Sequence, residues 1–365
     1  MRQTRRRRGP TRDEAGRTAY DDGRCDVERT VDETGLQLVH LLQIAPRASW
    51  AGLAPILGLS PSALAARWRR LEESGTAWLT VHADQAVTGH VTAIVRLECR
   101  PGSRVAVREA CVADPRVVGI DESSTGSELL LTVMVGDLHG LTAVLGDLES
   151  WRGVQRLRSF VVHDVMRGGS DWRLGNLDAE QVSAAEALAP DGDASSSRPA
   201  VPGGAGALAA LLTRDARMPI ADLARGVGAT AATTRRHLDR LVASGALAFR
   251  CDLAHDAADW PVTSAWFVRV PPSDLARTVT LLSTLTQLRL MLGVMGEVNL
   301  VFSVFGRSVS GVAAFEETLG RRLPWLEHVE SLLLLRSVKR MGWVLDEQGR
   351  RTDRLVVPAV LDRLG

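Results

Sequence analysis

Two short segments of the chain carry arginines and small polar residues at helical spacing, on the side opposite an apolar stripe. The outward-facing residues are Ser60, Ser62, Ala63, Ala66, Arg67 and Arg70 in the first segment, and Thr230, Thr233, Arg235, Arg236, His237 and Arg240 in the second. Arginine binds phosphate or reads guanine with two hydrogen bonds, and small side chains let a helix approach the bases closely. These residues therefore indicate recognition of double-stranded DNA.

Capping signals place each segment on the third helix of a helix-turn-helix unit. In the first unit, Asp32 and Ser49 are predicted to cap two helices, and Gly58 is predicted to take a left-handed conformation at the turn. Ser60 and Pro61 then supply a cap and a first-turn proline for the third helix. Its predicted buried stripe is Leu64, Trp68 and Leu71. In the second unit, Thr230 caps the third helix, and Thr234, Leu238 and Leu241 face the core.

The two units are copies of each other. Residues 38–79 align without a gap with residues 208–249. The identical positions in the first copy are Leu38, Leu41, Leu42, Arg47, Ala51, Leu53, Ala54, Gly58, Arg70, Leu71, Ser74 and Gly75. Most are apolar or glycine, so we expect the same packing in both copies.

A second pair of similar segments follows each unit. Residues 91–167 and 262–340 both show strand, helix, strand, strand, helix and strand patterns, with apolar strands and three- and four-residue helical spacing. The order βαββαβ predicts a ferredoxin-like sandwich. We expect the two sheets to pair, either within one chain or between chains.

The predicted fold class is α+β, with two winged or helix-turn-helix domains alternating with two ferredoxin-like domains. The predicted divisions are a disordered basic arm (1–29), helix-turn-helix domain 1 (30–84), ferredoxin-like domain 1 (88–167), a linker (168–206), helix-turn-helix domain 2 (207–255), ferredoxin-like domain 2 (261–340) and a C-terminal tail (341–365).

The residues that enzymes use do not form a recognisable motif. The four cysteines, Cys25, Cys99, Cys111 and Cys251, form no C-x-x-C pair, and the eight histidines form no H-x-x-x-H pair. We therefore predict no catalytic residues, no cofactor and no metal site. The chain also lacks a long apolar run, and we expect a reduced, cytoplasmic protein without a membrane segment.

The two copies differ in charge, which leaves an alternative open. Residues 205–250 are rich in arginine, whereas the first copy is nearly balanced and has Pro55 within its second helix. The first copy is the weaker candidate for DNA binding, unless Arg5–Arg8 in the arm grip the backbone or minor groove. A paralogue that only makes protein interactions is the alternative. A steep loss of DNA affinity with salt would distinguish the two.

The turn and the third-helix ending resemble those of the Lrp/AsnC, or feast/famine, regulators. The segment LAPILGLS at 53–60 and the segment RWRRLEESG at 67–75 match that family's L-A-x-x-x-G-L-S and R-x-x-R-L-E-x-x-G patterns. The second copy matches more loosely, from Leu223 to Thr230 and from Arg240 to Gly245. The resemblance covers nearly all of residues 31–340, in two rounds, and implies a βαββαβ domain that binds an effector and forms oligomers.

In this family, a hairpin between the second and third strands carries a G-D-x-D-type turn near the small-molecule pocket. The corresponding residues here are Gly126, Ser127 and Glu128 in the first round, and Gly296, Glu297 and Asn299 in the second. Both turns keep a glycine and neither keeps the two aspartates. They are candidates for binding an amino-acid-like effector, and plain hairpins in a domain that only dimerises are the alternative.

Proteins similar to this family include siroheme decarboxylases, some of them fused as two rounds. Those enzymes carry a segment with His and Tyr at the same hairpin, whereas residues 119–131 and 293–302 contain neither. The preferred interpretation is a non-enzymatic transcription regulator whose partners are double-stranded DNA, a small-molecule effector and further copies of itself. Because the third helices differ, we expect it to read two unlike half-sites.

Overall fold

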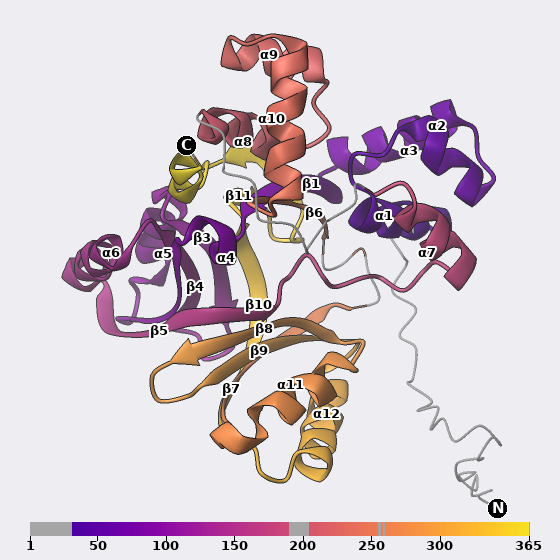
Figure 1. Ribbon diagram of the computed structural model, residues 1–365. Helices are drawn as coiled ribbons and strands as arrows, with labels where there is room; N and C mark the ends of the chain where they lie inside the picture. The colour runs from indigo at the N-terminus through magenta and orange to yellow at the C-terminus, as the bar shows by residue number, and fades with distance from the viewer. Residues whose placement is uncertain (1–30, 190–203, 255–256, 258–259, 365) are drawn as a thin grey trace, which may run out of the picture.

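The computed structural model describes residues 31–189, 204–254, 257 and 260–364 (Figure 1). The predicted arm at 1–29 lies outside these residues. In the first helix-turn-helix unit, α1 spans Glu33–Ile44 and α2 spans Trp50–Leu53, continued by the 3-10 turn η1 at Ala54–Leu57. The third helix α3 spans Pro61–Glu73, and the wing strand β1 spans Ala77–Ala83.

The predicted caps of this unit are confirmed. The side chains of Asp32, Ser49 and Ser60 each accept a hydrogen bond from a first-turn amide of the helix that follows. Gly58 has a φ of 64°, which the turn requires and glycine adopts without strain. The sequence predicted that Pro55 would remove a hydrogen bond from the second helix. In the structure, the α-helix gives way to the 3-10 turn η1 at this proline.

The second unit repeats this arrangement with a regular second helix. Helix α8 spans Ala205–Arg214, α9 spans Ile220–Val227, α10 spans Ala231–Ala243, and the wing strand β6 spans Leu247–Leu253. Thr230 caps α10 as predicted.

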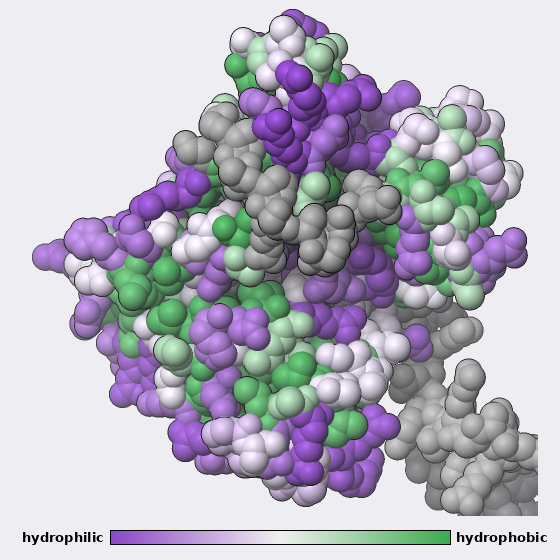
Figure 2. Space-filling model, in the orientation of Figure 1, coloured by the Kyte–Doolittle hydropathy of each residue, from purple (hydrophilic) through white to green (hydrophobic). Residues whose placement is uncertain are grey.

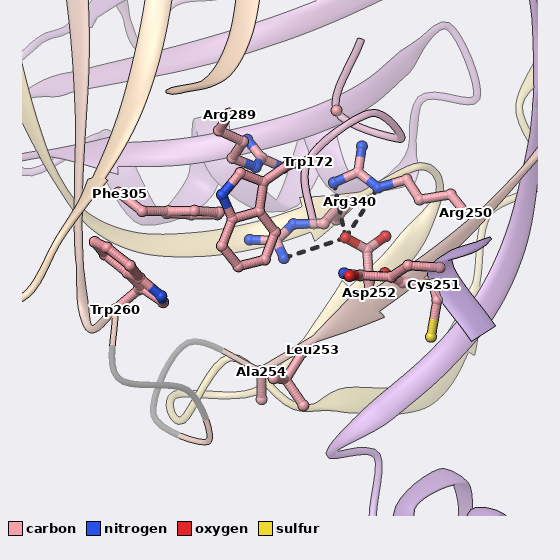
Figure 3. A pocket seen from close by; sticks show the side chains of 12 residues that line it. Trp172, Arg250, Cys251, Asp252, Leu253, Ala254, Trp260, Arg289, Phe305 and Arg340 are labelled. Atoms are coloured by element: carbon pink, nitrogen blue, oxygen red, sulfur yellow. Dashed lines mark hydrogen bonds and ion pairs between the residues drawn. The ribbon is translucent and has the colours of Figure 1, made fainter. Parts of the chain in front are cut away.

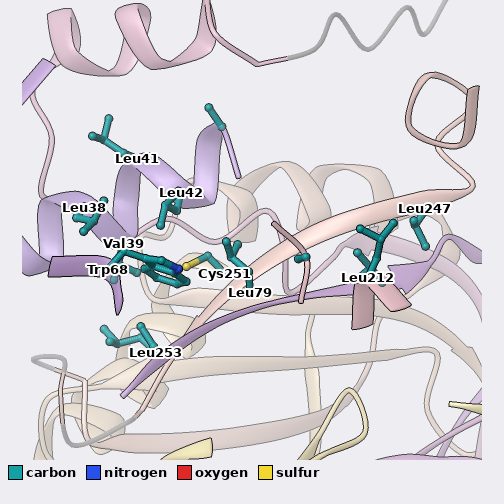
Figure 4. Packing of buried hydrophobic residues seen from close by; sticks show 14 of the residues in the cluster. Leu38, Val39, Leu41, Leu42, Trp68, Leu79, Leu212, Leu247, Cys251 and Leu253 are labelled. Atoms are coloured by element: carbon teal, nitrogen blue, oxygen red, sulfur yellow. The ribbon is translucent and has the colours of Figure 1, made fainter. Parts of the chain in front are cut away.

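The two wings pair with each other instead of forming separate hairpins. Strands β1 and β6 run antiparallel, with Thr80 opposite Arg250 near the centre. We call this pair the ribbon. One of its faces, with Leu79 and Cys251, belongs to a core shared by α1, α3, α8 and α10 (Figure 4). The two helix-turn-helix units are therefore one folded body, stabilised by the apolar area that both bury.

The first ferredoxin-like domain follows a short helix, α4, at Gln85–Thr88. Its elements are β2 (Val91–Cys99), α5 (Arg104–Ala113), β3 (Val117–Ser123), β4 (Glu128–Val135), α6 (Leu138–Ser150) and β5 (Val154–Arg167). The second domain contains β7 (Val262–Arg269), the 3-10 turn η3 (Pro272–Asp274), α11 (Leu275–Ser283), β8 (Leu288–Met295), β9 (Leu300–Gly306), α12 (Val309–Arg322) and β10 (Glu327–Arg340). The predicted βαββαβ order is thus found in both.

The two domains close one ring of strands within the chain. Strand β5 pairs with β8, and β10 pairs with both β3 and β7. The inner face is apolar, and Phe160 meets Phe267 there with ring centroids 5.2 Å apart. Helices α5 and α6 cover the outside of one half, and α11 and α12 cover the other (Figure 1). The sheet surface expected to make oligomers is therefore used in cis, and an oligomer remains a prediction that needs another surface.

The segments predicted as linker and tail differ from that prediction over their described parts. Helix α7 (Ala179–Glu186) packs on α1, and its Ala185 is fully buried. After β10, strands β11 (Trp343–Leu345) and β12 (Arg351–Leu355) extend the sheet, and the 3-10 turn η4 (Ala359–Arg363) packs on α8. The segment after β5 thus packs on the first helix-turn-helix unit, and the segment after β10 contacts both units, through η4 on α8 and through Arg351 on Gly75.

Candidate nucleic-acid interface and effector cavity

Helix α10 presents the larger exposed basic surface. Gly228 has a φ of 67°, and the Thr230 hydroxyl accepts a hydrogen bond from the Thr233 amide at 3.2 Å, which starts the helix after a sharp turn. Thr234, Leu238 and Leu241 are buried as predicted. Figure 2 shows hydrophilic side chains gathered along α10 at the top of the molecule.

The predicted DNA-binding residues of α10 lie on its outer side. Arg235, Arg236 and Arg240 are exposed, whereas Thr233 and His237 are half-buried. Among the described residues, none of the three arginines is within ion-pair distance of a carboxylate. Their guanidinium groups are available to an anionic partner.

Helix α3 has the same geometry but fewer free cations. Ser62, Ala63 and Arg70 are exposed, and Ala66 is half-buried. Arg67 points back to the cap of α1, where its Nη1 donates to both carboxylate oxygens of Asp32, at 2.5 and 2.7 Å. These bonds hold the pKa of Asp32 below its usual value. Arg67 is therefore not free for DNA in this structure.

A pair of arginines, Arg47 and Arg217, locks the two units together. Arg217 donates to the carbonyl oxygens of Pro46 and Ala48, at 2.5 and 2.6 Å. Arg47 donates to the carbonyls of Ala216 and, at 3.1 Å, Met218. The two sets of contacts are reciprocal, as at a two-fold axis between subunits. The sequence comparison found the identity at these positions but not its role, because the partners are backbone atoms.

The same lock involves aromatic rings. The Arg217 guanidinium lies 3.9 Å from the centroid of the Trp50 ring, and that of Arg47 lies 5.8 Å from the Phe249 ring. Burial and the neighbouring Arg47 lower the pKa of Arg217 to about 10. Because each arginine bonds backbone carbonyls of the other unit, this lock and the ribbon set the spacing between α3 and α10.

The predicted effector residues of the first hairpin lie at a polar cavity of about 300 Å³. Gly126 is at the tip with a φ of 81°, and Ser127 and Glu128 line the cavity. The other lining residues are Arg96, Glu98, Thr125, Arg156, Arg158 and Glu330. Arg96 binds Glu128 at 2.5 Å and one oxygen of Glu330 at 2.8 Å, which joins the two ferredoxin-like domains. Arg96, within an apolar strand, was the signal that sequence reasoning missed.

The second hairpin contributes less to this cavity. Gly296 has a φ of 146°, and the Glu297 carboxylate lies 3.4 Å from Arg158, which lines the cavity. Asn299 is occupied elsewhere, because its amide group bonds both the N–H and the carbonyl of Val270, at 2.9 and 2.7 Å. The structure therefore brings together the predicted residues of one hairpin and one residue of the other.

Groups of side chains suited to a metal ion are not found among the described residues. No helix in the described ranges is long and apolar enough to cross a membrane.

The fold and the two capped third helices define a duplicated helix-turn-helix protein with ferredoxin-like domains. Residues 31–72 match the family of AsnC-type helix-turn-helix domains, and residues 210–247 match a winged helix-turn-helix DNA-binding family. The resemblance to the Lrp/AsnC regulators, with the family unit duplicated, is thereby confirmed. No curated protein sequence matches the chain.

Solved structures with the same duplicated arrangement include the siroheme decarboxylase NirDL. It has 16% identity to this chain, covers 83% of it and 92% of its own length, and has a TM-score of 0.52. The same enzyme with an iron-uroporphyrin III analogue has 15% identity, coverages of 90% and 96%, and a TM-score of 0.53. AsnC from E. coli has 16% identity, covers 37% of this chain and 93% of its own, and has a TM-score of 0.32. At this identity the likeness to NirDL shows a shared fold.

Proposed function

We propose that the chain is a sequence-specific transcription regulator that reads two unlike half-sites of double-stranded DNA. The observation that carries the proposal is the pair of capped third helices, α3 and α10, held at one spacing by the ribbon and by Arg47 and Arg217. One chain thereby supplies the two recognition helices for which helix-turn-helix proteins usually need a dimer.

The two recognition helices, α3 and α10, contribute unequally to DNA binding. Helix α10 offers three exposed arginines, and α3 offers Arg69 and Arg70, with Arg67 bound to Asp32. Arginines that contact bases bidentately contribute roughly 1–3 kcal/mol each to discrimination. The half-site under α10 should be the better defined, and the one under α3 should depend more on phosphate contacts and DNA shape.

We propose further that the cavity at the first hairpin binds an amino-acid-like effector. It presents both guanidinium and carboxylate groups, which suits a ligand with one acidic and one basic group. Arg96 and Glu330 in its wall come from different domains, so a ligand that displaces their ion pair would alter the contact between the domains.

The test is selection of bound duplexes from a random pool by the full chain, followed by affinity measurements over a range of salt. We expect an asymmetric site and an affinity that falls steeply with salt. Replacing Arg236 and Arg240 with Ala should lower affinity by about 1–3 kcal/mol for each of the two arginines that reads a base. The matched variants are R69A/R70A in α3, with a smaller loss, and R321A/R322A on exposed α12, with none.

A palindromic site would contradict the unlike half-sites. Weak, salt-insensitive binding would favour a paralogue that only makes protein interactions.

A second candidate is a siroheme-decarboxylase-like enzyme, because NirDL shares the fold over most of the chain. Against it, neither hairpin contains His or Tyr. Stoichiometric tetrapyrrole in the absorption spectrum of the purified protein would favour this candidate over the regulator.

A further inference from the structure

Three arginines from three strands meet between the ribbon and the strand ring. Arg250 is on β6, Arg289 on β8 and Arg340 on β10, and they line a small pocket with Trp172 and Phe305 (Figure 3). We call it the arginine pocket. It is distinct from the cavity at the first hairpin, with which it shares no lining residue.

Within the described residues, the pocket brings three arginines close to two aspartates. Asp252 accepts from Arg250 Nε and Nη2, at 2.9 and 2.7 Å, and lies 3.5 Å from Arg340. Asp121 on the neighbouring β3 is half-buried, and desolvation raises its pKa above the usual value. Arg289 donates no hydrogen bond and forms no ion pair within the described parts of the chain. Its guanidinium lies 5.3 Å from the Phe305 ring centroid.

This uncompensated charge is costly. Burial, followed by repulsion from Arg250 and Arg340, lowers the pKa of Arg289 to about 9. A partly buried cation without a hydrogen-bonding or ion-pair partner destabilises a fold, and it is usually retained for what it binds.

The equivalent position in the other half shows that the fold does not need the charge of Arg289. The matching registers of β3–β4 and β8–β9 put Val118 where Arg289 stands, and Val118 is buried. An apolar side chain therefore serves at this strand position in the first ferredoxin-like domain, whereas the second has an arginine.

We propose that the arginine pocket binds the carboxylate group of a small-molecule ligand. The cavity has a volume of about 30 Å³, which suits a group of two or three heavy atoms. A guanidinium fork binds a carboxylate through two parallel hydrogen bonds, and Arg289 has its donors unused within the described residues. Trp172 and Phe305, packed edge to face with ring centroids 4.8 Å apart, supply an aromatic wall for the rest of the ligand.

Such a ligand would connect three parts of the molecule. Arg250 belongs to the second wing, Arg289 and Arg340 to the second ferredoxin-like domain, and Trp172 to the segment after β5. Binding would therefore hold α10 in a fixed orientation on the strand ring. This coupling to DNA rests on the proposed function, whereas the binding itself does not.

The experiment measures Tm of the full chain, without DNA, in sodium acetate, sodium benzoate and sodium phosphate, each against sodium chloride of equal ionic strength. We expect both carboxylates at saturation to raise Tm of the wild type by about 2–4 °C, and benzoate to act at lower concentration. R289Q should lose the response, whereas R322Q, which removes an exposed arginine of α12, should keep it.

A second readout separates a ligand-binding arginine from a structural one. In chloride alone, R289Q should have a Tm equal to or above that of the wild type, because it removes an unpaired cation. A lower Tm in chloride, no response to either carboxylate, or a response to phosphate alone would each overturn the proposal. Because no DNA is present, failure here leaves the DNA-binding proposal standing.

Discussion

The first and second helix-turn-helix units share one framework and differ in what their third helices leave free. The first keeps more of the family pattern, including the L-E-x-x-G ending, yet its Arg67 is bound to Asp32. The second keeps less of the pattern and leaves three arginines of α10 exposed. The family pattern therefore reports packing more than DNA recognition.

Gly75, in the L-E-x-x-G ending, illustrates this point. It has a φ of 67°, and a Cβ there would lie 2.1 Å from the Arg351 carbonyl oxygen, because β12 passes close by. Its counterpart Gly245 has only Val87 in reach, at 3.6 Å from such a Cβ. Both glycines end their helix with a positive φ, and in the first unit the same residue also allows the close approach of the C-terminal segment.

The largest loss of stability is expected from variants of Arg47 and Arg217, which join the two units. Replacing Arg217 with Met leaves the Pro46 and Ala48 carbonyls without their donors. We expect the free energy of unfolding to fall by about 2–4 kcal/mol, given two charge-assisted hydrogen bonds partly offset by the cost of burying the cation. Urea unfolding measures this, with R214A at the exposed end of α8 as the control. R47M should match R217M, and a loss confined to one of them would break the two-fold relation.

Local features of both units could be predicted from the sequence, and their assembly could not. The caps at Asp32, Ser60 and Thr230 and the turn at Gly58 depend on neighbours within four residues, so the sequence displays them. The pairing of β1 with β6 joins segments far apart in the chain, and both wings show the same apolar alternation whichever strand they pair with. The arginine pocket likewise depends on three strands whose meeting follows only from closure of the ring.

Acid should affect the first unit more than the second, because His40 has no histidine counterpart. Burial, followed by repulsion from Arg173, lowers the pKa of His40 to about 4 from 6.5. Between these values the unfolded chain binds a proton that the native chain does not. The free energy of unfolding therefore falls as pH drops through this window, by up to about 3 kcal/mol for this residue.

The place to observe this is the amide of Leu177, which donates to His40 Nδ1 at 3.1 Å. A protonated Nδ1 cannot accept, so the protection factor of the Leu177 amide, which compares its exchange with the intrinsic rate at the same pH, should fall near pH 4 before those in α10. His82 and His90 have similarly lowered pKa values and contribute to the same overall trend. H40Q should flatten the dependence of stability on pH, and H139Q, at an exposed site, should not. Equal slopes in the two variants would remove His40 from the explanation.

Releasing Arg67 from Asp32 should give the first unit a third arginine available to DNA, as the second unit has. Asp32→Ser keeps a side-chain cap for α1 and removes the carboxylate that holds Arg67. At low salt we expect affinity for a non-specific duplex to rise up to about tenfold, roughly one added phosphate contact. Fluorescence anisotropy measures this, and D32S/R67A is the control. A gain that persists in the double variant would be due to removal of the carboxylate alone.

The smallest difference is expected at the two turns, where the units are most alike. Gly58 and Gly228 have φ values of 64° and 67°, and a Cβ at either would meet nothing within 4 Å. Alanine at each site therefore carries only the strain of the left-handed conformation, about 1 kcal/mol. Urea unfolding of G58A and G228A should give the same loss, even though Pro55 makes the preceding turn a 3-10 turn in the first unit alone. A larger loss for G58A would mean that the turn after the 3-10 segment accepts alanine less readily than the turn after α9. The two units would then differ in their backbone framework as well as in their exposed surfaces.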